Sequence, residues 1–330
     1  MATKRPPLYS MQSGRRGRRG PPRPPLGRIA VVVVAAALLG AAAFAVWQVL
    51  PLTRTQEGII PAAALTGVVP ATSPGGQGQP AFDANGASSR PIPGVRVSAG
   101  VIVDAGSGRV LWMHRAHTPR PVASLTKLMT ALLADRGGVL HRFTITPAMT
   151  SAPGYTIGLQ AGERVSVRDM LAGALIASAN DAADALAVHR AGSIRRFVAM
   201  MNREAAKMHL ADTHYSNPSG IIDQGNHSSA WDVAYLARAV LQRSALRGLV
   251  GAKFYRPAHG SPFVNGNRLL WTYTGTIGVK TGQTTLSGNC LAAAARRHGH
   301  TVIAVELNAS GDEFDTAAHM LTWGLRRARR

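Results

Sequence analysis

The chain of 330 residues has little cysteine, little acid and few aromatic rings. Its single cysteine, Cys290, excludes an intrachain disulfide framework and a multi-cysteine zinc site. Only 16 Asp and Glu residues oppose 37 Lys and Arg residues, which gives a formal net charge of +21 at pH 7. Such a basic chain suggests a nucleic-acid binder, but aromatic residues make up only 5% of the sequence. Aromatic side chains on which bases could stack are therefore scarce. Where the positive charge lies along the chain then decides whether nucleic-acid binding is plausible.

The excess positive charge lies mainly at the two ends of the chain. Residues 1–28 contain eight Lys and Arg residues and no acid, and residues 326–330 contain four Arg. These twelve charges leave +9 for the rest of the chain, where they are spread thinly. The basic N-terminal tail is rich in Pro and Gly, so we do not expect it to fold. We predict no nucleic-acid partner.

An uncharged apolar run follows this tail. The 22 residues of Ile29–Leu50 carry no charge, and about 20 apolar residues suffice for a helix to cross a bilayer. Lys and Arg favour the cytoplasmic side, so we predict a cytoplasmic tail at 1–28, a transmembrane anchor at 29–50 and an exported remainder. Two alternatives are a signal peptide cleaved near Ala43–Ala45 and a buried core helix. The core helix would need a polar face, which the run lacks.

The remaining chain divides into a spacer and one folded domain. Residues 51–95 are rich in Gly, Pro, Ser, Ala and Gln and show no apolar periodicity, which is typical of a flexible linker. From residue 96 to 330 the pattern is that of a folded domain. Two short strands are predicted around the turn at 104–108, and a helix is predicted from Ser124 to near Gly137.

The middle and the end of this domain differ in pattern. We predict a mainly helical stretch over 167–244, including a capping box at 229–232 that opens a helix. Three strands, TIGVKTG, NCLAAAA and TVIAVELN, then precede a final helix over 314–327. Strands at both ends of the domain predict an α+β fold. One sheet would be built from the N- and C-terminal segments, with helices packed on it and a helical lobe inserted between them.

The first motif that carries chemistry is Ser124-Leu125-Thr126-Lys127. Residues i and i+3 share one face of a helix, so the Lys127 amine can approach the Ser124 hydroxyl. A serine needs a base to become a nucleophile, and a lysine can serve if burial lowers its pKa. Taken alone, the same pattern describes a serine N-cap followed by a solvated surface lysine. The chain has only five lysines, however, and this is its only S-x-x-K.

Two further motifs follow along the chain. In Ser178-Ala179-Asn180, a hydroxyl and a carboxamide two residues apart can face one cleft, although a polar interhelical turn has the same residues. In Lys280-Thr281-Gly282, the first two side chains can bind a carboxylate, and a glycine lets a peptide lie along the strand. Alternatively, Lys280-Thr281-Gly282 is only the end of a strand followed by a glycine turn, with no role in binding.

Together these motifs make the chain resemble the low-molecular-mass penicillin-binding proteins, which are serine D-alanyl-D-alanine carboxypeptidases. The resemblance covers about 97–325. The matching segments are ASLTKLMT at 123–130, SANDAA at 178–183, Met201-Asn202, SNPSG at 216–220, GVKTG at 278–282 and LTWG at 321–324.

The resemblance implies a two-lobed fold of the β-lactamase and transpeptidase type and a bacterial enzyme that needs no cofactor or metal. Ser124 would attack the bond between two terminal D-alanines of a peptidoglycan stem peptide, with Lys127 as the base. Ser178 would relay protons and Asn180 would position the substrate. Lys280 and Thr281 would bind the terminal carboxylate beside Gly282. The backbone N–H groups of Ser124 and Gln283 would form the oxyanion hole, and β-lactams would acylate Ser124.

The sequence also departs from the family's pattern. Relatives often carry an arginine that grips the carboxylate at the position of Glu313, so either Lys280 and Thr281 hold it alone or another arginine does. A β-lactamase would need a deacylating glutamate, but no Glu lies between Glu204 and Glu306. A non-catalytic wall-binding or β-lactam-sensing module remains an alternative, as does a DD-endopeptidase or transpeptidase that uses the same residues.

Overall fold

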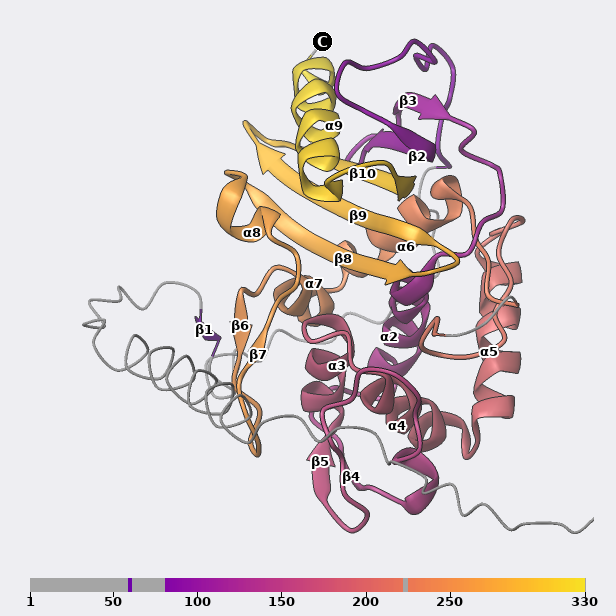
Figure 1. Cartoon of the computed structure of the whole chain (residues 1–330), viewed down its shortest axis with the longest axis vertical. Helices are drawn as coiled ribbons and strands as arrows, with labels where there is room; N and C mark the ends of the chain where they lie inside the picture. The colour runs from indigo at the N-terminus through magenta and orange to yellow at the C-terminus, as the bar shows by residue number, and fades with distance from the viewer. Residues whose placement is uncertain (1–58, 61–80, 222–224, 330) are drawn as a thin grey trace, which may run out of the picture. The chain divides into compact units, whose positions relative to one another are not determined.

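The structure is a computed structural model that describes residues 59–60, 81–221 and 225–329 (Figure 1). The predicted cytoplasmic tail at 1–28 and the predicted anchor at 29–50 lie outside these described residues. Within them, no helix combines the length and the apolar character that crossing a membrane requires.

A five-stranded antiparallel sheet of order β3-β2-β10-β9-β8 forms the centre of the domain. Its strands are β2 (Val97–Asp104), β3 (Val110–His114), β8 (Thr276–Thr284), β9 (Gly288–Arg297) and β10 (His300–Ala309). N-terminal and C-terminal segments therefore share one sheet, as the sequence predicts. Strand β8 forms one edge.

Both faces of the sheet are covered, which explains why its central strands are almost entirely apolar. Helix α9 (Glu313–Ala328) packs on one face, where Val302 and Ala304 of β10 point. Ile303 and Val305 point to the other face, toward α6 (Ala230–Gln242) and the helical lobe. Figure 1 shows α9 in yellow across the sheet.

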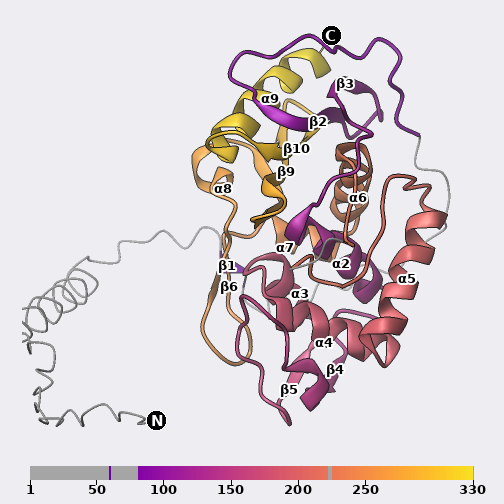
Figure 2. The same cartoon turned by 45° about the vertical axis from the view of Figure 1, so that its right-hand side comes forward.

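The helical lobe is inserted between β3 and β8. Its elements are η1 (Ala123–Thr126), α2 (Lys127–Asp135), η2 (Pro147–Met149), α3 (Val167–Leu175), α4 (Asn180–Ala191), α5 (Ile194–Lys207), α6, α7 (Ser244–Val250) and α8 (Leu269–Thr272). Figure 2 shows α2, α3, α4, α5 and α6 beyond the face of the sheet opposite α9. The sequence predicts the helices between 167 and 244, but residues 208–229 are not helical. Two small sheets were not predicted: β4 (Arg142–Thr144) with β5 (Arg164–Ser166), and β1 (Ile59–Ile60), β6 (Phe254–Tyr255) and β7 (Phe263–Val264).

Two local features differ from the sequence prediction. At the start of α6, Ser229 Oγ accepts a hydrogen bond from the Asp232 backbone N–H at 3.2 Å. The Asp232 carboxylate instead accepts from the Asp212 backbone N–H and the Thr213 hydroxyl, so only half of the predicted capping box forms.

The second difference concerns the end of the predicted spacer. Phe82 is 8% exposed and Ile92 is 5% exposed, and the Asp83 backbone N–H donates to the Gly108 carbonyl. Buried apolar side chains and paired backbone groups are features of folded chain. Residues 81–95 therefore pack on the domain that begins, by sequence pattern, at residue 96.

Candidate active site

Ser124 lies in η1, immediately after a strained backbone position. Ala123 has φ +47°, in the left-handed region that L-residues other than glycine seldom adopt. The Ala123 carbonyl presses against Gly220, at which a Cβ atom would overlap it. Gly220 itself has φ +81°. Only a glycine at 220 therefore permits the close approach that holds the turn before Ser124.

Lys127 begins helix α2, and its side chain is fully buried. Its Nζ atom lies 2.9 Å from Ser124 Oγ, 2.7 Å from Asn180 Oδ1 and 2.9 Å from the Ser219 carbonyl oxygen. A charged ammonium can donate to all three oxygens. A neutral amine donates only two N–H bonds, which the Asn180 and Ser219 oxygens can accept. Its lone pair then faces the Ser124 hydroxyl, which is the geometry of a general base.

The surroundings favour the neutral form of this amine. Burial is the main cause that lowers the pKa of Lys127 well below its usual value, and the positive charge of Lys280 lowers it further. Asp184 and Asp181 act in the opposite direction. A lysine whose charge is disfavoured by desolvation and by a second cation can take a proton from a nearby hydroxyl.

Ser178 and Lys280 form a second hydroxyl–amine pair. The Lys280 Nζ donates to Ser178 Oγ and to the Thr281 carbonyl oxygen, both at 2.9 Å. Ser178 has φ +63°, another left-handed position at a loop between helices. Lys280 is 2% exposed, and burial lowers its pKa to about 7. Proton transfer through this pair is therefore possible near neutral pH.

Asn180 connects the first lysine to the surrounding loop. Its Oδ1 accepts from Lys127, and its Nδ2 donates to the Pro153 carbonyl at 2.7 Å. The next residue, Asp181, accepts from the backbone N–H groups of residues 157, 158 and 159. Asp181 thus fixes the loop that covers Asn180. This role of Asp181 cannot be predicted from the sequence, because only the fold brings residues 157–159 to it.

Strand β8 passes directly beside Ser124. A Cβ atom at Gly282 would lie 3.1 Å from the Ser124 backbone nitrogen and 3.0 Å from the Val122 carbonyl. The absence of a side chain therefore lets the two backbones meet. Thr281 is half-buried and Gln283 is exposed on the same strand. All eight residues predicted for the site lie on η1, on α2, at the α3–α4 junction or on β8.

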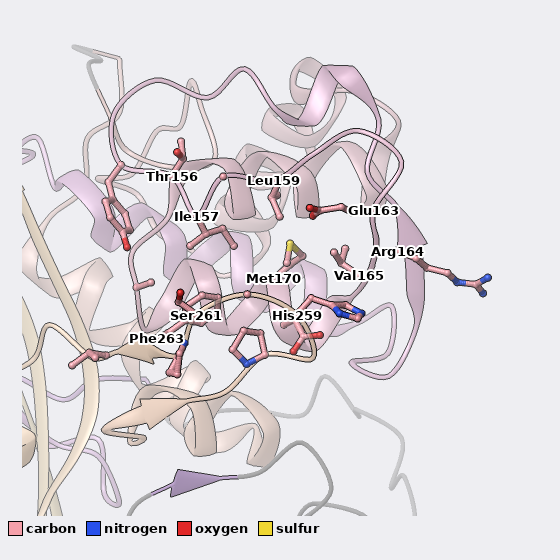
Figure 3. A pocket seen from close by; sticks show the side chains of 18 of the residues that line it. Thr156, Ile157, Leu159, Glu163, Arg164, Val165, Met170, His259, Ser261 and Phe263 are labelled. Carbon is pink, nitrogen blue, oxygen red and sulfur yellow. The ribbon is translucent and has the colours of Figure 1, made fainter. Parts of the chain in front are cut away.

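A cavity of about 1010 Å³ adjoins this cluster (Figure 3). It is bounded by the loop at 155–159, the hairpin of β4 and β5, and the segment 257–264, and Ala177 is the lining residue next to Ser178. Glu163 and His259 give its wall polar groups, whereas the Arg164 side chain points away from it. Ser124, Lys127, Ser178 and Lys280 do not line this cavity, so it lies next to the cluster and does not contain it.

These contacts define a class of site: a serine hydroxyl with a buried lysine, a second hydroxyl–lysine pair and a strand edge for an extended peptide. Such a set suits acyl transfer through a covalent serine intermediate. Within the described ranges, no three His, Cys, Asp or Glu side chains group as metal ligands do.

Comparison with known proteins identifies the family. A family profile described as D-alanyl-D-alanine carboxypeptidase matches residues 86–311. The chain belongs to this family, which confirms the resemblance. It is 36% identical over 248 residues to the D-alanyl-D-alanine carboxypeptidase DacD of Escherichia coli, covering 70% of this chain and 64% of that protein. It is 35% identical over 220 residues to DacF of Bacillus subtilis, covering 64% of this chain and 57% of that protein. The matches therefore leave over a third of these relatives' length uncovered.

Solved structures show the same fold. A Streptomyces DD-transpeptidase superposes with a TM-score of 0.67 at 30% identity, covering 72% of this chain and 100% of that chain. A D-alanyl-D-alanine carboxypeptidase from Mycobacterium tuberculosis superposes with a TM-score of 0.68 at 29% identity, covering 73% and 95% respectively. Helices packed on an antiparallel sheet, as predicted, are thus the fold of this family.

Proposed function

We propose that the protein is a serine D-alanyl-D-alanine carboxypeptidase that removes the terminal D-alanine from peptidoglycan stem peptides. The observation that carries this proposal is the 2.9 Å contact between Ser124 Oγ and the buried Nζ of Lys127. Membership of the family and the names of the curated relatives support the same activity.

In the proposed first step, Lys127 Nζ takes the proton of Ser124 while Oγ attacks the carbonyl carbon of the penultimate D-alanine. The oxyanion that forms is stabilised by the backbone N–H groups of Ser124 and Gln283. The position of Gly282 against the Ser124 backbone supports this assignment, since it brings β8 beside the nucleophile.

In the second step, the C–N bond breaks and the leaving D-alanine amine needs a proton. Ser178 Oγ gives this proton, and its contact with Lys280 allows the hydroxyl to be reprotonated. Asn180 binds the substrate amide and also accepts a hydrogen bond from Lys127. Lys280 and Thr281 bind the terminal carboxylate of the substrate. Water then hydrolyses the acyl-enzyme, and β-lactams acylate the same serine because they mimic the dipeptide.

For the N-terminal region we propose a cytoplasmic tail at 1–28, a membrane anchor at 29–50 and a spacer that leads to an extracytoplasmic domain. The charge pattern and the length of the apolar run support this topology. Sequencing the N-terminus of the membrane-bound protein tests it, because a mature chain that begins near residue 46 would mean cleavage instead.

A second candidate activity is transfer of the acyl group to an amine, or cleavage of crosslinks, at the same site. The similarity to the solved Streptomyces DD-transpeptidase favours it. Adding an acceptor amine such as glycine to the assay separates the activities, since a transpeptidase forms a new peptide at the expense of hydrolysis.

The test of the main proposal is release of D-alanine from a synthetic pentapeptide ending in D-Ala-D-Ala. We expect release by the wild type and none above background by Ser124→Ala. Penicillin labelling of the wild type without D-alanine release would contradict carboxypeptidase activity and favour the sensing or crosslink-cleaving alternatives.

A further inference from the structure

The terminal carboxylate of a carboxypeptidase substrate needs a cation at the end of strand β8. Lys280 is a weak provider of this charge, because its pKa is lowered to about 7 by burial. Its Nζ already donates to Ser178 and to the Thr281 carbonyl. Acids also lie near this corner of the sheet, at Asp312 and Glu313 at the start of α9. A permanent cation there would offset them.

The register of the sheet shows on which side the Thr281 hydroxyl lies. Thr281 pairs with Leu291 on β9, and Leu291 pairs with Glu306 on β10. Directly opposed residues of antiparallel strands point to the same face of a sheet. Leu291 belongs to the apolar cluster beneath α9. The Thr281 side chain therefore points to the face that α9 covers.

The segment before α8 passes over this hydroxyl. A Cβ atom at Gly266 would lie 3.6 Å from Thr281 Oγ1. Asn265 and Asn267 on either side are buried, and the Asn265 amide donates to the Ala252 carbonyl at 2.9 Å. Gly266, which lies between them, and Arg268, which follows Asn267, are both exposed. Two residues of chain span at most about 7 Å, so Arg268 starts close to Thr281.

The Arg268 guanidinium is held on the α9 side of the sheet. Its Nη2 lies 2.8 Å from Asp312 Oδ2, and its carbon Cζ sits 4.6 Å from the centre of the Phe314 ring. Asp312 Oδ1 accepts the backbone N–H groups of Phe314 and Asp315, so the same carboxylate caps α9. A guanidinium has five N–H donors, and 58% of the Arg268 side chain is exposed. Donors therefore remain for a ligand.

We propose that Arg268, steered by Asp312 and Phe314, is the cation that selects substrates with a free terminal carboxylate at Thr281. This proposal rests on the proposed carboxypeptidase function and assigns to Arg268 the task that Glu313 cannot perform. A guanidinium keeps its charge at every pH at which the enzyme works, and it can bind a carboxylate through two parallel hydrogen bonds.

The test compares two peptides that differ only at the C-terminus: one ends in D-Ala-D-Ala with a free carboxylate, and the other ends in D-Ala-D-alaninamide. Arg268→Gln is expected to lower kcat/KM for the free acid about ten- to a hundredfold, since a hydrogen bond to a charged group is lost. The amide peptide, a poorer substrate of the wild type, should be cleaved at an unchanged rate. Arg268→Lys should keep part of the preference for the acid.

A matched control is Arg297→Gln, because Arg297 also stacks on an aromatic ring, that of Tyr273, near the opposite end of β8. It should change neither rate. Equal losses on both peptides in Arg268→Gln would overturn the proposal, since they would mean that Arg268 only ties α8 to α9. An unchanged preference for the acid would overturn it as well. If the wild type cleaves neither peptide, the carboxypeptidase function itself fails, which is a distinct result.

Discussion

The burial of Lys280 should make the free energy of unfolding depend on pH, and the substitution Lys280→Met should remove this contribution. In the unfolded chain this lysine titrates near its usual pKa of 10.5, whereas in the folded protein burial lowers its pKa to about 7. Between these values only the unfolded state holds the proton. Raising the pH through this window therefore stabilises the folded state.

The size of the effect follows from the shift. Each pKa unit corresponds to about 1.4 kcal/mol, so a window of three pH units gives about 4 kcal/mol as an upper bound. Lys280→Met lacks this contribution. We expect the free energy of unfolding of the wild type, minus that of Lys280→Met, to rise by about 2–4 kcal/mol from pH 7 to pH 10.

Urea unfolding at pH 7, 8, 9 and 10 measures this difference. Lys207→Met is the matched control, because Lys207 is exposed on α5 and should be solvated alike in both states. A difference between the wild type and Lys280→Met that stays constant from pH 7 to pH 10 would refute the reasoning. It would mean that Lys280 keeps its ordinary affinity for protons in the folded protein.

Three further substitutions test other parts of the structure. Lys127→Met should slow acylation by a fluorescent penicillin about 10²- to 10⁴-fold, and an unchanged rate would exclude Lys127 as the base. Gly220→Ala should lower the free energy of unfolding by several kcal/mol more than the control Gly86→Ala. A Cβ atom at position 220 would overlap the Ala123 carbonyl, whereas one at position 86 would meet nothing within 4 Å. Equal losses of stability in thermal unfolding would contradict this clash. Glu306 is fully buried, neither of its carboxylate oxygens has a hydrogen-bond partner among the described residues, and burial raises its pKa well above 4.5. The free energy of unfolding of the wild type, minus that of Glu306→Gln, should therefore fall as the pH rises above about 4.5, and parallel pH profiles of the two proteins would argue against a buried neutral acid.

Much of the fold could be predicted from the sequence because its signals are local. Alternating and continuous apolar runs marked the strands that became β2, β3, β8, β9 and β10, and the 3.6-residue period marked α2 and α9. The hairpin of β4 and β5 has strands of only three residues each, which is too short for a periodic signal. The packing of residues 81–95 was also missed, since a stretch rich in Gly, Ala, Ser and Pro resembles a linker unless its apolar residues Phe82 and Ile92 find partners.

The candidate site residues could be found because short motifs carry them, and the structure places Ser124 beside Lys127 as the i, i+3 spacing predicts. The contact between Ser178 and Lys280 was not predicted, since it joins residues 102 positions apart. Their supporting contacts could not be predicted. The Ser219 carbonyl that binds Lys127 is 92 residues away in sequence, so only the folded chain brings it there. The same holds for the contact of Arg268 with Asp312, which joins residues 44 positions apart.

The most direct test of the account is to locate the acyl group on the protein. The wild type would be mixed with penicillin, or with a D-Ala-D-Ala peptide and quenched within one turnover, then digested and mapped by mass spectrometry. We predict an acyl group on Ser124 with either reagent and none at this position in Ser124→Ala. An acyl group on any other residue of the wild type, or equal labelling of the two proteins, would contradict the account.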